Sequence, residues 1–238
     1  MSNFFSMDGA FYKVGSLIAD IMILSFFWIL FSIPLFTIGT STTALYYVMT
    51  RRISNREGYL FRDFWTSFKS NFKQTTIIWI IFIVVFYILF INIKNIDLVG
   101  NMKTFIFPVQ ICFLIELVLC LLYIIPINAR FEISLKDSFK TAFFMANRHL
   151  LTSVVCVLTG AAIVFASLYT GILFLVAMGL YVYLTSFLFI RIFRKYRPEI
   201  DQDPLLAEQA GVAPASAAAD EILEYNGEDD DRSQQTEQ

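Results

Sequence analysis

Charged residues are scarce in this chain: they make up 16% of its 238 residues, and it contains one histidine, His149. The sequence has no glycine-rich phosphate loop, no metal-ligand spacing and no motif of paired carboxylates. No serine, aspartate or cysteine stands in a recognisable nucleophilic arrangement with His149. We therefore expect no enzymatic activity, no catalytic residue, no metal, no cofactor and no nucleic-acid partner.

Cysteine is also rare. The three cysteines, Cys112, Cys120 and Cys156, all lie within apolar runs. The first two are eight residues apart on what we expect to be one helix, so the spacing indicates no disulfide framework.

Apolar residues are abundant instead. Hydrophobic residues make up 57% of the chain and aromatic residues 17%, with 26 phenylalanines. This composition is too apolar for an ordinary soluble domain and predicts an all-α membrane protein that crosses the lipid bilayer several times.

The net charge of −2 hides a strong asymmetry. Residues 1–198 carry 17 Lys and Arg against 8 Asp and Glu, whereas residues 199–238 carry 1 against 12. We interpret residues 1–198 as a membrane domain and residues 199–238 as an acidic, disordered cytosolic tail.

The lengths of the apolar runs predict five transmembrane helices. Pro34 and Gly39 should end the first span, which we expect to be retained rather than cleaved, and a short second helix should follow over residues 42–50. Residues 150–190 contain no charge and are long enough for two spans, with a turn at residues 167–171. The predicted spans are residues 14–33, 75–93, 104–127, 150–166 and 171–190.

The basic residues predict the orientation of these spans. With the N-terminus outside and the C-terminus inside, 15 Lys and Arg lie in the inner segments and 3 in the outer ones. Positive residues accumulate on the cytosolic side of membrane proteins. The count therefore favours an N-outside, C-inside topology.

Two segments combine helical periodicity with basic residues. In residues 61–73 the aromatic side chains share one arc of a helix, and residues 135–148 repeat the pattern more weakly. We expect both to be amphipathic helices in the cytosolic membrane surface and possible halves of a parallel internal repeat. The predicted membrane-binding residues are Phe61, Phe64, Trp65, Phe68, Phe72 and Phe139.

Glu116 is the most informative polar residue within a predicted span. It lies at the middle of residues 104–127, where an ionised carboxylate is costly, so it should face protein together with Cys112, Cys120 and Tyr123. It could hydrogen-bond a neighbouring helix, take part in the passage of an ion or solute, or join Cys112 and Cys120 at a metal. The first alternative, a hydrogen bond to a Thr, Tyr or Ser of a neighbouring span, is the simplest, because such bonds between membrane helices are ordinary and modest. The metal is the least favoured, because no histidine within a span completes a ligand set.

Asp20 is the second polar candidate within a span. It lies about 10 Å along the helix from Lys13. We expect it near the outer interface, satisfied by water or by Lys13.

The N-terminal half resembles the YesL-like family of small bacterial membrane proteins. The resemblance is carried by Ile33-Pro34, Thr37-Ile38-Gly39, Thr42-Thr43-Ala44-Leu45-Tyr46-Tyr47 and Arg51-Arg52, and it extends to about residue 197. Where family members usually have a Gly-Pro-Ala-Thr-like sequence, this chain has Gly39-Thr40-Ser41-Thr42.

This resemblance implies a protein of the bacterial cytoplasmic membrane without an assigned biochemical activity. Members are often encoded beside ABC-type carbohydrate uptake systems and glycoside-degrading enzymes, which implies an accessory role with a sugar permease as partner. The alternative is a small transporter or channel that uses Glu116. The residues themselves leave the oligomeric state open.

Overall fold

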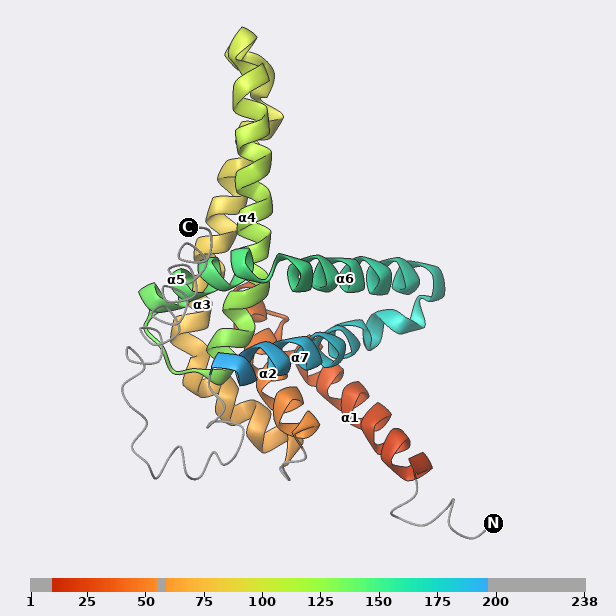
Figure 1. The fold of residues 1–238 in the computed structure, drawn as a ribbon. Helices are drawn as coiled ribbons and strands as arrows, with labels where there is room; N and C mark the ends of the chain where they lie inside the picture. The colour runs from red at the N-terminus through yellow and green to blue at the C-terminus, as the bar shows by residue number, and fades with distance from the viewer. Residues whose placement is uncertain (1–9, 55–58, 197–238) are drawn as a thin grey trace, which may run out of the picture.

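The computed structural model describes residues 10–54 and 59–196, which form helices joined by short connections (Figure 1). No strand occurs within these two ranges, so the all-α prediction is confirmed for them. The predicted acidic tail lies outside the described residues. The helices are α1 (Ala10–Phe31), η2 (Leu35–Thr37), α2 (Ile38–Ile53), α3 (Leu60–Lys94), η3 (Ile96–Met102), α4 (Lys103–Arg130), α5 (Leu135–Arg148), α6 (Leu150–Thr170), η4 (Ile172–Leu175) and α7 (Ala177–Tyr196).

Helix α3 joins two segments that the sequence predicts to be separate. Its 35 residues run without a break from the amphipathic stretch into the predicted span at residues 75–93. At a rise of about 1.5 Å per residue it is roughly 52 Å long, well above the ~30 Å of a hydrocarbon core. The separate surface helix predicted at residues 61–73 is therefore wrong, because the side chains change character there while the backbone stays helical.

The break predicted near Pro34 is present. Helix α1 ends at Phe31, Pro34 has extended backbone angles, and the turn η2 leads into α2. The hydroxyl of Thr37 donates to the carbonyls of Phe31 and Pro34, each at 2.6 Å, and so satisfies two backbone acceptors at the turn. The helix that follows is longer than the predicted residues 42–50.

Helix α2 lies at the centre of the packed body and contacts α1, α3, α4 and α7. Nearly all of its residues from Gly39 to Met49 are buried. The buried hydroxyls of Thr42 and Thr43 keep hydrogen-bond partners, because they donate to the carbonyls of Ile38 and Gly39, four residues earlier.

Tyr46 connects α2 to α7. Its hydroxyl lies 2.8 Å from that of Thr185, and its ring packs edge-on against Phe189. Burial raises the pKa of Tyr46 well above its ordinary value, so the phenol stays protonated and available for this hydrogen bond.

Two helical hairpins leave this body in different directions (Figure 1). The end of α3 and the start of α4 form one, and α6 with α7 forms the other. Both expose large apolar side chains; Val84, Phe105, Leu151 and Phe165 are all about half exposed or more. Such surfaces are suited to lipid or to another membrane protein.

Four helices are long and apolar enough to cross a membrane: α1 from Val14, α3, α4 and α6. The apolar part of α7, Ala177–Phe193, falls in a shorter class. It begins six residues after the predicted start of the fifth span, because Gly171, at φ 65°, and the turn η4 take up the intervening chain. The structure thus supports a membrane protein with four candidate spans, and the fifth span stays a prediction.

Candidate functional site

Glu116 lies near the middle of α4 and is half buried. Its Oε1 accepts a hydrogen bond of 2.8 Å from Nδ2 of Asn147, in the last turn of α5. The second amphipathic segment therefore runs back along α4 and supplies a partner to the carboxylate. This contact agrees with the simplest of the three roles considered for Glu116, with an asparagine of α5 as the donor in place of a Thr, Tyr or Ser of a span.

The other residues of the Glu116 stripe lie in different environments. Cys112 is exposed, whereas Cys120 and Tyr123 are buried. The hydroxyl of Tyr123 donates to the carbonyl of His149 and accepts from the hydroxyl of Ser153, both at 3.2 Å. Within the described ranges, no three His, Cys, Asp or Glu side chains are grouped so as to hold a metal ion.

Asp20 is paired with a residue of another helix. Its Oδ2 accepts from Nε of Arg52 at 2.6 Å, and Nη2 of Arg52 also donates to the hydroxyl of Ser16 at 3.2 Å. The predicted topology placed Arg52 on the inner side and Asp20 near the outer interface. These two placements cannot both be right, because two side chains in contact cannot lie at opposite faces of a membrane.

Arg51 makes a second connection from the same turn of α2. Its Nη1 lies 3.5 Å from Oδ2 of the buried Asp63 in α3 and donates to the hydroxyl of Tyr47 at 3.2 Å. The two consecutive arginines thus point to two different helices, Arg51 to α3 and Arg52 to α1. Both charges are used in ion pairs that connect α2 to α3 and to α1.

Gln74 is the centre of a polar cluster that the sequence analysis missed. Its Nε2 donates to Oδ1 of Asn128 at 2.8 Å, to the carbonyl of Ile133 at 2.7 Å and to the hydroxyl of Ser138 at 3.2 Å. Ser138 in turn donates to Oδ1 of Asn128 at 3.0 Å. This cluster joins α3, α4 and α5 and so connects the two amphipathic segments.

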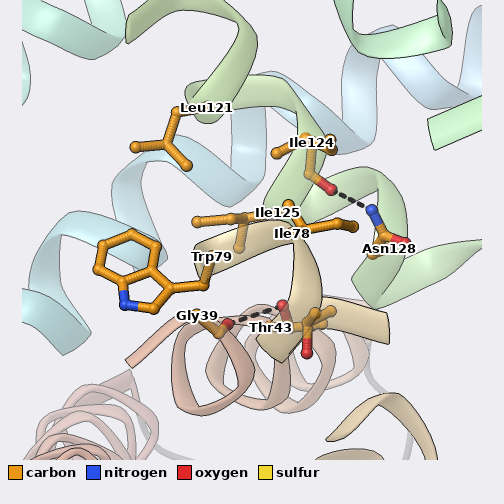
Figure 2. Close-up of a pocket in the computed structure, with 9 residues that line it drawn as sticks. Gly39, Thr43, Ile78, Trp79, Leu121, Ile124, Ile125 and Asn128 are labelled. Atoms are coloured by element: carbon orange, nitrogen blue, oxygen red, sulfur yellow. Dashed lines mark hydrogen bonds between the residues drawn. The ribbon is translucent and has the colours of Figure 1, made fainter. Parts of the chain in front are cut away.

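A small cavity lies where α2, α3 and α4 meet, and its lining is shown in Figure 2. It is lined mainly by apolar side chains, with Gly39 and Thr43 of α2 on one side and Asn128 of α4 on another. The space open to the centre of a water molecule is about 10 Å³. That is near the lower limit for one water, so this cavity does not accommodate a sugar.

Gly39 allows α2 and α3 to approach closely beside this cavity. A Cβ at this position would lie 2.8 Å from Cβ of Trp79 and 3.2 Å from the carbonyl oxygen of Thr75. Hydroxyls bridge the same crossing: Thr40 lies 2.9 Å from Thr75 and 3.0 Å from Thr76. The contact therefore resembles the close, small-residue packing of helices in membranes.

The aromatic residues predicted to bind the membrane divide into buried and exposed groups. Phe64 is fully buried and packs against Phe27 and Phe31 of α1, and Phe68 is buried beside it. Phe61 and Trp65 are exposed. The single predicted face thus contains both core and surface residues.

The two remaining aromatic candidates are half buried. Phe72 packs against Phe68 with ring centroids 5.6 Å apart. Phe139 of α5 stacks on Phe82 of α3 at 5.7 Å. Both rings contribute to contacts within the protein, and their role toward the membrane stays a prediction.

Comparison with known proteins finds a similarity in the first part of the chain. Residues 21–93 match the family model described as "Protein of unknown function, DUF624". The matched segment covers the second half of α1, all of α2 and nearly all of α3, which are the helices that Arg51, Arg52 and Gly39 hold together. Neither the curated proteins nor the solved structures contain a match. The chain is thus similar, from the middle of α1 to nearly the end of α3, to a family of uncharacterised proteins, which is compatible with the resemblance noted from the sequence.

Proposed function

We propose that this protein is a non-enzymatic accessory subunit of an ABC-type carbohydrate uptake system in the bacterial cytoplasmic membrane. The accessory role is supported by the contrast between a very small internal cavity and a large exposed apolar surface. The cavity at the junction of α2, α3 and α4 has room for about one water, whereas both hairpins expose large apolar side chains. Such a molecule is better suited to contact lipid and other membrane subunits than to enclose a substrate.

The polar groups support a structural role in the same way. Arg51, Arg52 and Gln74 are used in contacts between helices, and Glu116 accepts from Asn147. A binding or catalytic site usually keeps several such groups directed into a pocket. The sugar substrate of the uptake system follows from the family resemblance, not from a sugar-binding site.

For the orientation, we propose that Arg51 and Arg52 face the cytosol and that the tip of the α3–α4 hairpin, between Lys94 and Lys103, faces outward. The distribution of basic residues supports this, because the tip carries few of them and one, Lys103, is paired with Asp97 at 3.0 Å. The C-terminal basic residues then lie on the cytosolic side. Single cysteines placed at the exposed residues 66 and 98, in a chain without its native cysteines, test this orientation in intact cells. A membrane-impermeant maleimide should label residue 98 and not residue 66, and the reverse pattern would contradict the orientation.

The accessory role is tested by affinity purification of the full chain from native membranes in a mild detergent. We expect a sugar permease or solute-binding component to be enriched at least ten-fold over the same purification from cells without the tag. Recovery of this protein without any such component would contradict the role.

Transport through the protein itself is the second candidate function. It is favoured by one observation: Glu116 is an ionisable group in the middle of a candidate span, with an amide rather than a cation as its described partner. Flux measurements on a Glu116 variant separate the two functions.

A further inference from the structure

The first half of α3 exposes a row of cations on its outer face. Arg62, Lys69 and Lys73 are seven and four residues apart, so they fall within an arc of about 40° on a helix of 3.6 residues per turn. All three are exposed. The opposite face, which includes Asp63 and Phe64, is buried in the body. We refer to Arg62, Lys69 and Lys73 as the cationic row.

Exposed aromatic rings accompany the cationic row. Tyr59 is 73% exposed and Trp65 38%. The guanidinium carbon of Arg62 lies 5.3 Å from the centre of the Tyr59 ring, and Nζ of Lys69 lies 5.6 Å from that of Trp65. Cations beside exposed aromatic rings are typical of the headgroup level of a membrane, where the rings contact lipid and the charges meet phosphates.

The position of the row along α3 relates it to the membrane-crossing hairpin. Lys73 is the last charged residue before Lys94, and the helix between them is apolar and largely exposed. Because α3 is continuous, Lys69 and Lys73 lie in the two helical turns that come directly before this apolar stretch. Lysine side chains at this distance reach the headgroups by extending along the helix.

The charges of the row are not neutralised by the described part of the protein. The ion pairs there are Arg51 with Asp63, Arg52 with Asp20, and Lys103 with Asp97, none of which includes a residue of the row. An exposed row of like charges favours an anionic partner.

We propose that the cationic row binds the headgroup of an anionic phospholipid in the leaflet at the base of the α3–α4 hairpin. The phosphate is held by Lys69 and Lys73. Trp65 lies one turn before Lys69, on the side away from the apolar stretch, and its ring lies beside the Lys69 ammonium at the headgroup level. This inference does not depend on a role in sugar uptake.

The test uses the full chain in a mild detergent, titrated separately with dioctanoyl phosphatidylglycerol, dioctanoyl phosphatidylcholine and inorganic phosphate. A basic residue near an anionic surface contributes about five-fold to binding, so Lys69→Gln with Lys73→Gln should weaken phosphatidylglycerol binding by about 25-fold. The control is Lys94→Gln with Lys103→Gln, which removes the same charge at the far end of the hairpin and should leave the affinity within about two-fold. Thermal unfolding checks that both variants are folded, as expected for exposed substitutions.

Three results would overturn the proposal. Equal binding of the two phospholipids would show that charge is not recognised, and phosphate binding as tight as phosphatidylglycerol would indicate a site for a free anion. Unchanged phosphatidylglycerol binding in the Lys69, Lys73 variant would show that the lipid binds elsewhere on the protein and not at the row.

Discussion

Nε of Arg52 lies 2.6 Å from Oδ2 of Asp20, and this ion pair holds the end of α2 against α1. The side chain of Asp20 is 11% exposed, so removal of Arg52 leaves a largely buried carboxylate without its cation. We expect Arg52→Gln and Asp20→Asn each to destabilise the protein and the double variant to lose less than their sum. The coupling energy should be about 0.5–3 kcal/mol, measured by thermal unfolding in detergent.

The matched control is the pair Lys103 and Asp97 at the tip of the α3–α4 hairpin. Their side chains are 54% and 82% exposed, so the coupling there should be at most about 1 kcal/mol. Equal coupling in the two pairs would contradict the structural role of Arg52.

Gly39 should not tolerate a side chain. In Gly39→Ala the new Cβ meets Cβ of Trp79 and the backbone of Thr75, which are held in a packed helix. We expect a loss of about 1–3 kcal/mol in the free energy of unfolding. Gly15→Ala is the control, since no heavy atom lies within 4 Å of its Cβ, and a similar loss in both variants would argue against the close crossing of α2 and α3.

Phe64 and Phe61 should respond differently to truncation although they belong to the same predicted aromatic face. Phe64 is 0% exposed and Phe61 54%. Phe64→Ala should therefore cost about 3–5 kcal/mol in unfolding free energy, and Phe61→Ala less than about 1 kcal/mol. If the two variants unfold at the same temperature, Phe64 faces lipid rather than the core.

The apolar runs predicted most of the helices, but the contacts between helices could not be read from them. Residues 75–93 and 104–127 were predicted as spans and lie within α3 and α4. The predicted break before residue 75 is absent, because a change from amphipathic to apolar side chains does not require a change of backbone angles. Hydropathy alone does not show whether a helix ends or continues at such a change.

The burial of α2 was missed for a different reason. Its Thr and Ser side chains are polar, yet their hydroxyls bond within the helix or to α3 and are therefore compatible with burial. The partners of Asp20, Gln74 and Glu116 likewise come from residues 31 to 64 positions away in the chain. No periodicity within one segment contains that information.

Glu116→Gln separates the accessory role from transport. A glutamine Oε1 still accepts the hydrogen bond of Asn147, so we expect a folded protein with a melting temperature close to the wild type. Under the accessory role, sugar and proton movement in reconstituted vesicles should be the same with either side chain. A flux that the wild type supports and this variant abolishes would instead establish Glu116 as a transport residue.

The continuity of α3 is the central claim, since one unbroken helix connects the packed body to the membrane-crossing hairpin. Spin labels at the exposed positions Thr66 and Ile91, in a chain whose three native cysteines are replaced by serine, measure it directly by double electron–electron resonance. The 25 residues between the labelled positions predict a distance of about 38 Å along a single α-helix. A surface helix that turns at a right angle into the span near Gln74 gives about 28 Å, and that shorter distance would contradict the account.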